Sequence, residues 1–162
     1  MALDRPEWGL EDWDEDWLFF VHGTTLETFD PTVGIIEMGA GDFGSGFYTY
    51  LASGRYADWG TKNAYEWAVR KSSEKQQTPC LVYVKIPLDV FVTMSRLDCN
   101  RHDCQSVYAQ YDPSTQTGYE MVVGPVGRRQ SGQKAPDDSK PFQFKLEGLG
   151  LTKLIFDRIE SQ

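Results

Sequence analysis

Basic residues are scarce in this chain of 162 residues. Lys and Arg together number 16 against 24 Asp and Glu, so the formal net charge at pH 7 is −8. This shortage argues against nucleic-acid binding, because such proteins displace counterions from phosphates with clustered Lys and Arg. It also disfavours long-range attraction to anionic membranes. A local basic pocket for one anionic ligand remains compatible with this charge balance.

Long apolar runs and a secretory pattern are also missing. No stretch approaches the ~20 apolar residues that a membrane-spanning helix needs. The first residues, 1–16, are acidic and rich in Trp, without a basic region followed by an apolar core. We expect a cytoplasmic chain, and delivery into another cell remains open. Residues 1–16 either form an acidic arm or pack their tryptophans on the domain.

Cysteine is rare, with three in the chain. The odd number and the missing signal fit a reducing compartment. The segment 99–104, CNRHDC, puts two thiols and an imidazole close together. A zinc site normally needs four ligands in paired spacing, and no second pair exists. We therefore expect a surface loop with free thiols here, and no metal.

Apolar residues are present in the amount that a folded domain needs. Hydrophobic residues make up 40% of the chain and aromatic residues 14%, enough for the core of one domain over residues 1–162. Apolar and β-branched runs predict a series of strands. The expected strands cover residues 17–23, 47–50, 79–87, 90–94, 119–126, 142–146 and 152–159.

Helices are expected in two places. Ser53 is a plausible N-cap for a helix with apolar residues at helical spacing as far as Lys71, and Gly60 is a candidate break in it. Thr24 and Glu27 have capping-box spacing and predict a short helix. Segments 95–118 and 131–140 are polar and are expected to be loops. Many strands with segregated helices predict an α+β fold rather than a doubly wound α/β fold.

The stretch Gly39–Tyr50, GAGDFGSGFYTY, contains four glycines within eight residues, followed by an aromatic strand pattern. Glycine permits backbone angles that other residues resist, and it lets a ligand approach the main chain. Two interpretations fit: one wall of a nucleotide pocket, or a glycine-rich turn leading into an edge strand.

Three polar residues stand out on the expected strands: His22, Tyr48 and Glu120. His22 could be a structural histidine and Tyr48 a core residue. Glu120 directly precedes the apolar run Met121–Val123, and carboxylates are seldom buried without a partner. A carboxylate that points from a strand into a cleft is a candidate functional group.

The order of three short motifs resembles a known family. These are His22-Gly23-Thr24, then Gly44-Ser45-Gly46-Phe47-Tyr48, then Tyr119-Glu120 followed by Met-Val-Val. Together they resemble the His-Tyr-Glu signature of ADP-ribosyltransferases of the diphtheria-toxin and poly(ADP-ribose) polymerase type. The run Asp42–Tyr48 is especially similar to a little-characterised subgroup with a DFG-x-GFY motif.

The resemblance implies two packed, mainly antiparallel sheets with few helices, and NAD as the substrate without a metal. It implies a mono-ADP-ribosyltransferase that transfers ADP-ribose to a protein or small acceptor, or to water. Glu120 would be catalytic and His22 would bind the adenosine ribose. The backbone of Gly23 would bind the nicotinamide amide, with a hydroxyl from Thr24 in the same pocket, and Tyr48 would pack on the nicotinamide ring.

The family also has a second stacking aromatic, with a nearby serine. Ser53 and Tyr56 fit this pattern, and Trp59 and Tyr65 are rivals for the aromatic position. Either Arg55 or Lys62 would meet the pyrophosphate. Two other readings remain: a catalytically inactive NAD-binding or protein-interaction module of the same fold, and an ordinary structural α+β domain.

Overall fold

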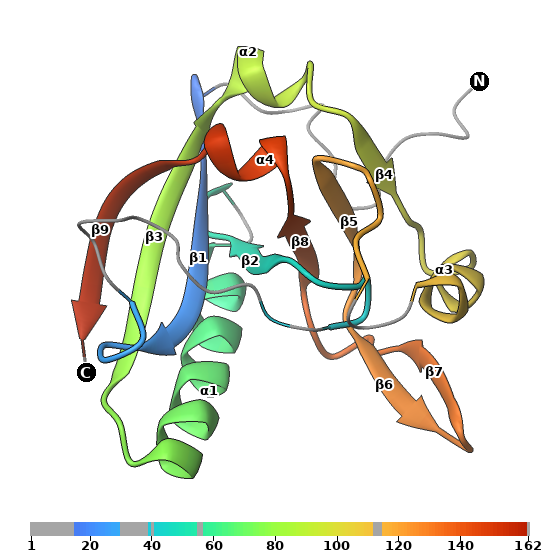
Figure 1. Cartoon of the computed structure of the whole chain (residues 1–162), viewed down its shortest axis with the longest axis horizontal. Helices are drawn as coiled ribbons and strands as arrows, with labels where there is room; N and C mark the ends of the chain where they lie inside the picture. Colours follow the sequence, from blue (N-terminus) through green and yellow to red (C-terminus); the bar gives the residue numbers. More distant parts are fainter. Residues whose placement is uncertain (1–14, 30–38, 40, 55–56, 112–114, 162) are drawn as a thin grey trace.

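The computed structural model describes residues 15–29, 39, 41–54, 57–111 and 115–161. The described chain is α+β, as the sequence predicts, and consists mostly of strands (Figure 1). The strands are β1 (Trp17–Thr25), β2 (Phe47–Leu51), β3 (Pro79–Pro87), β4 (Arg96–Asp98), β5 (Met121–Pro125), β6 (Gly127–Gln130), β7 (Gln133–Pro136), β8 (Phe142–Leu146) and β9 (Ile155–Ser161). The helices are α1 (Ala57–Lys75), α2 (Leu88–Phe91), α3 (Cys104–Gln110) and α4 (Leu149–Thr152).

Seven strands form one sheet in the order β4-β5-β8-β2-β1-β3-β9. All neighbouring pairs are antiparallel except β4 and β5, which are parallel. Strands β6 and β7 form a separate two-stranded sheet, a hairpin. The expected pair of packed sheets is therefore replaced by one large sheet and a small hairpin.

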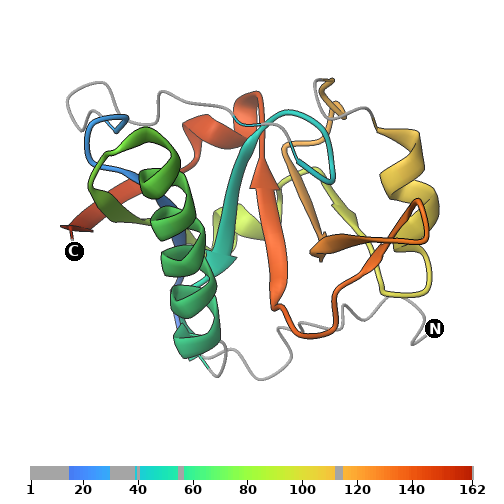
Figure 2. The same cartoon turned by 90° about the horizontal axis from the view of Figure 1, so that it is seen from below.

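The two faces of the large sheet carry different cores, because successive side chains along a strand point to opposite faces. Phe20, Phe47 and Phe144 belong to the larger apolar cluster on one face. On the other face, which we call the helix face, Val21 packs with Ala64 of α1, and Val122 belongs to a cluster with residues of α3. Figure 2 shows α1 lying along this face, with the β6–β7 hairpin and α3 at its far end.

Helix α1 is continuous, so the predicted break at Gly60 is wrong. A Cβ atom on Gly60 would lie 2.2 Å from the carbonyl oxygen of Leu51. A Cβ on Gly23 of β1 would likewise lie 2.0 Å from the carbonyl oxygen of Ala64. Both glycines let the backbone of α1 approach the strands more closely than any side chain would allow. The glycine thus marks a close packing contact rather than a helix end.

Several other local predictions are wrong, some of them because the sequence does not show which strands pair. Thr24 and Thr25 continue β1 instead of starting a helix, since they pair with Cys80 and Pro79 of β3. The predicted strand 90–94 overlaps helix α2 and a turn. The predicted loop 131–140 contains β7, and the predicted loop 95–118 contains β4 and α3. The last strand is β9, and α4 precedes it.

The CNRHDC segment has free thiols and a turn at residues 101–103, as predicted, but the thiols do not lie at the surface. Cys99 and Cys104 are free but buried, in an apolar cluster with Phe43, Tyr108 and Val122. Within the described ranges, no group of three or more His, Cys, Asp or Glu side chains is placed to hold a metal ion. Across the same ranges, no helix combines the length and apolar character needed to cross a membrane.

Candidate functional site

A cavity of about 460 Å³ opens on the helix face, over β2 and β8. Its floor is formed by side chains of these strands, its sides by α1 and by the β6–β7 hairpin with the turn after it, and its end by the glycine-rich loop. The lining includes Gly41, Asp42, Gly46, Tyr48, Tyr50, Glu66, Trp67, Arg70, Lys71, Gly127, Arg128, Asp137, Lys140 and Gln143. The glycine-rich stretch is therefore a cavity wall in this structure.

The glycine-rich loop is held by its own backbone and by Tyr48. Gly39 and Gly46 exchange two backbone hydrogen bonds of 2.9 Å each. The Tyr48 hydroxyl accepts a hydrogen bond from the Phe43 amide at 2.9 Å and donates one to the carbonyl of Gly44 at 2.6 Å. Burial raises the pKa of Tyr48 well above its ordinary value. The phenol therefore stays protonated and serves as a structural donor at neutral pH.

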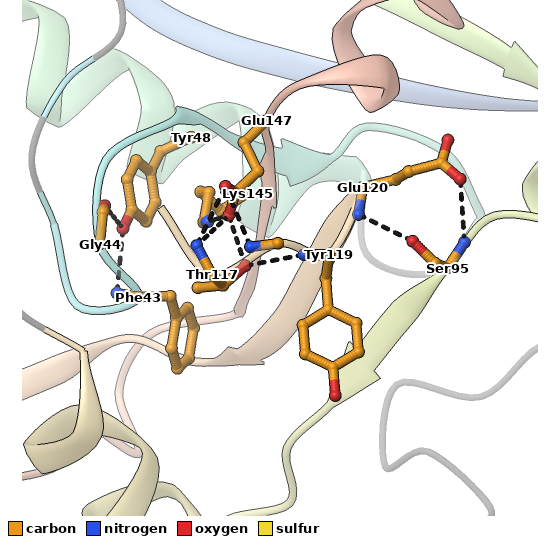
Figure 3. A network of polar contacts seen from close by, with 10 residues as sticks. Phe43, Gly44, Tyr48, Ser95, Thr117, Tyr119, Glu120, Lys145 and Glu147 are labelled. Atoms are coloured by element: carbon orange, nitrogen blue, oxygen red, sulfur yellow. Dashed lines mark hydrogen bonds and ion pairs between the residues drawn. The ribbon is translucent and has the colours of Figure 1, made fainter. Parts of the chain in front are cut away.

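A buried ion pair supports the loop from below. Lys145 of β8 donates to Glu147, and the exposed fractions of the two side chains are 0% and 2% (Figure 3). Glu147 also accepts hydrogen bonds from the amide and the hydroxyl of Thr117. Burial opposes ionisation of Glu147, but these hydrogen bonds outweigh it and hold the carboxyl pKa below its ordinary value. Burial lowers the pKa of Lys145, against the effect of its hydrogen bond to Glu147. Lys145 lies directly opposite Tyr48 on the neighbouring strand.

Sequence reasoning missed this pair, although a signal for it existed. The FQFKL pattern places Lys145 on the face opposite Phe144, and Glu147 follows two residues later on the same side. Two side chains of opposite charge that are two residues apart lie on the same face of a strand. Next to an apolar run, as with Lys145 and Glu147, this spacing indicates a buried ion pair. The sequence does not show that this pair lies next to Gly46. That contact arises only when β2 pairs with β8 and brings Gly46 against Lys145 and Leu146.

His22 contacts the backbone of Tyr48. The His22 Nδ1 atom lies 2.6 Å from the Tyr48 carbonyl oxygen, so Nδ1 carries the hydrogen. The imidazole packs on Phe47, with ring centroids 4.1 Å apart. Phe47 belongs to the cluster on the opposite face from Tyr48. His22 and Gly23 are both lining residues of the cavity. The contact with Phe47, however, places the His22 imidazole on the face of the sheet opposite the Tyr48 side chain.

Of the other predicted binding residues that the structure describes, none is a lining residue of the cavity. Thr24 is buried in β1 and is not among the lining residues. Ser53 accepts a hydrogen bond from the amide of Phe19 at 3.0 Å, so it ties the end of β2 to β1. Arg55 and Tyr56 lie outside the described residues. Their rivals Trp59 and Tyr65, and also Lys62, are on α1 but are not lining residues; Trp67 and Arg70 are.

Glu120 is not a lining residue of the cavity. Its carboxylate forms an ion pair with Lys153 and accepts a hydrogen bond from the Ser95 amide at 3.2 Å. Its own amide donates to the Ser95 hydroxyl at 3.0 Å. The hydrogen bond from Lys153 holds the pKa of Glu120 below its ordinary value. Figure 3 shows the Glu120 side chain pointing away from Tyr48, Lys145 and Glu147. The third motif is therefore separated from the first two.

The cavity differs in charge from the rest of the chain. Four cationic side chains line it, together with three carboxylates, in a protein with a formal net charge of −8. The cations are Arg70, Lys71, Arg128 and Lys140, and the carboxylates are Asp42, Glu66 and Asp137. The lining therefore carries one more positive than negative side chain, and Lys140 and Glu66 form an ion pair with each other. Comparisons of the chain with protein-family models, with curated proteins and with solved structures found no match.

Proposed function

We propose that the chain binds NAD in this cavity and acts as a mono-ADP-ribosyltransferase, with a protein, a small molecule or water as acceptor. The proposal includes that the sheet is a form of the ADP-ribosyltransferase fold. The observation that carries it is the composition of the cavity: two of the three family motifs contribute to its lining, beside aromatic and cationic side chains. Glu120 is the catalytic residue in this proposal, on the basis of the resemblance.

The side chains suit a dinucleotide group by group. Tyr48, Tyr50 and Trp67 offer aromatic surfaces for flat rings. Arg70 and Arg128 offer guanidinium groups, which pair well with phosphate oxygens. Carboxylates are acceptors for ribose hydroxyls. The volume of about 460 Å³ lies within the ordinary range for ligand pockets, roughly 300–1,000 Å³.

The proposed reaction breaks the bond between the nicotinamide nitrogen and C1 of the ribose. The bonding electrons leave with nicotinamide, and positive charge develops on the ribose. A carboxylate near this carbon stabilises the charge more in the transition state than in the ground state. The acceptor oxygen or nitrogen then bonds to C1 and loses its proton. For Glu120 to act here, its carboxylate has to leave Lys153 and turn toward the cavity.

A second candidate function is a NAD-binding or protein-interaction module without turnover. The ion pair between Glu120 and Lys153 favours it, because a carboxylate neutralised outside the cavity does not face the substrate. In this case the chain would bind NAD with the same residues, and Glu120 would have a structural role.

One experiment separates the two candidates. NAD binding is measured by calorimetry, and nicotinamide release is measured by chromatography, for the wild type, Glu120→Gln and the control Glu74→Gln on the exposed side of α1. The transferase predicts release by the wild type and the control, with unchanged NAD affinity but at least about 100-fold slower release for Glu120→Gln. Binding without release in all three proteins supports the inactive module. Absence of NAD binding refutes the transferase and the NAD-binding module, so that the protein-interaction module is then the candidate that stands.

A further inference from the structure

Asp42 joins three separate parts of the cavity wall. Its Oδ2 atom accepts a hydrogen bond from the Gly127 amide at 2.7 Å and another from Gln143 Nε2 at 2.8 Å. Its Oδ1 atom lies 3.1 Å from Nζ of Lys134, and the side chain is only 15% exposed. One carboxylate of the glycine-rich loop therefore contacts β6, β7 and β8.

The β6–β7 hairpin depends on such contacts for its position. It shares no ladder of hydrogen bonds with the large sheet, and isolated two-stranded hairpins are marginally stable. Its base is closed by the Asp137 amide, which donates to the Val126 carbonyl at 2.7 Å. The Asp42 contact lies at the start of β6. A Cβ on Gly127 would lie 3.0 Å from Oδ1, so the carboxylate rests directly on the hairpin backbone.

The residue after Gly127 is Arg128, which lines the cavity. The placement of its guanidinium follows from the placement of the strand that carries it. Another link across the cavity is the ion pair between Lys140 and Glu66 of α1, with an N–O distance of 3.4 Å. Both of these side chains are substantially exposed, and exposed ion pairs contribute little. The carboxylate of Asp42 is the more buried of the two links.

We propose that Asp42 is a positioning residue that holds the β6–β7 hairpin against the glycine-rich loop, so that Arg128 faces a phosphate group of the bound ligand. The identity of that phosphate as the diphosphate of NAD rests on the proposed function. The role of Asp42 in placing Arg128 is independent of the proposed function, because that role follows from contacts within the chain.

A simple electrostatic effect has the opposite sign, which makes the proposal testable. Asp42→Asn removes a negative charge from the cavity wall, and this alone strengthens the binding of an anion. Loss of the positioning contact weakens binding, because Asn offers neither the ion pair with Lys134 nor a charged acceptor for the Gly127 amide. The direction of the change in anion affinity therefore distinguishes the two effects.

The experiment measures binding of inorganic pyrophosphate, ADP, adenosine and NAD by calorimetry. Asp42→Asn, Arg128→Gln and the double variant are compared with the control Asp138→Asn, whose exposed carboxylate pairs with Arg101 outside the cavity lining. We expect each single variant to bind pyrophosphate and ADP about tenfold more weakly, with adenosine unchanged. The double variant should be no weaker than Arg128→Gln, because both changes act through one guanidinium.

Gly127→Ala provides a test without a change of charge. Its Cβ would press on the Asp42 carboxylate, so we expect weaker pyrophosphate binding here too; this variant replaces Asp42→Asn if the latter fails to fold. The proposal is overturned if Asp42→Asn binds pyrophosphate as tightly as the wild type or more tightly, or if its affinity for adenosine falls as much as its affinity for pyrophosphate. It is also overturned if the losses of affinity in the two single variants multiply in the double variant. A wild type that binds neither pyrophosphate nor ADP overturns it as well. Pyrophosphate binding that follows the expected pattern without NAD binding upholds it and refutes the proposed function.

Discussion

Gly46→Ala tests whether the buried ion pair supports the glycine-rich loop. The added Cβ would lie 2.1 Å from Cδ of Lys145 and 2.8 Å from the carbonyl oxygen of Leu146. The Lys145 chain is fully buried, and its ammonium group is held by Glu147, so it has no free direction in which to move. Either the lysine leaves its partner, or β2 and β8 separate at this point.

The magnitude follows from these two routes. Overpacking a tight site costs about 1–3 kcal/mol, and breaking a buried ion pair costs about 3–5 kcal/mol. We expect a loss of about 3 kcal/mol in the free energy of unfolding. For a chain of this length, about 2–4 °C of melting temperature corresponds to each kcal/mol. The expected fall in melting temperature is therefore about 6–12 °C.

Urea unfolding followed by tryptophan fluorescence measures this change, and Gly39→Ala is the matched control. Gly39 lies opposite Gly46 in the same backbone pair, but a Cβ there meets nothing within 4 Å. We expect its free energy of unfolding to stay within about 0.5 kcal/mol of the wild type. Equal stability of the two variants would refute the reasoning.

Three further results are expected. The folded-state pKa of Glu147 is lowered, so its contribution to stability is fully present above its unfolded pKa, about 4.3, and is lost as the pH falls through the folded-state pKa. Unfolding measured as a function of pH should show this loss, and the loss should be smaller in Gly46→Ala, where the ion pair is already disturbed. Burial raises the pKa of Cys99 to about 12, so its thiol should react with a disulfide reagent at pH 8 only after denaturation; rapid labelling of Cys99 in the folded protein, located by mass spectrometry, would contradict this. Tyr48→Phe leaves the Phe43 amide without its acceptor and should cost about 1–3 kcal/mol in urea unfolding, whereas an unchanged midpoint would show that the hydroxyl does not hold the loop.

Much of the strand content could be predicted from the sequence, because the main strands carry either apolar runs or an alternation of apolar and polar residues. The predicted strand 142–146 matches β8, and 79–87 matches β3. Gly60 was misread because a glycine that ends a helix and a glycine that admits a neighbouring backbone look the same locally. Thr24 was misread because pairing with β3 outweighs a local capping preference.

The candidate site was less accessible to sequence reasoning. The motifs predicted that His22, Tyr48 and Glu120 share one site; His22 and Tyr48 are lining residues of one cavity, whereas Glu120 is not. The hairpin wall was missed, because residues 127–136 are polar and carry no strong strand pattern. The sequence also gave no means to foresee that Lys153, more than thirty residues away, pairs with the carboxylate of Glu120.

The two sides of the cavity are held in different ways. Gly23 and Gly60 allow α1 to pack tightly on the sheet, which makes the helix the rigid side. Backbone meets backbone at Gly23 with Ala64 and at Gly60 with Leu51, so α1 has no slack with which to shift toward or away from the sheet. The hairpin opposite is positioned chiefly by side-chain contacts. We therefore expect a wider ligand in this cavity to displace the hairpin rather than α1, and selection for a new ligand to act first on residues 127–140.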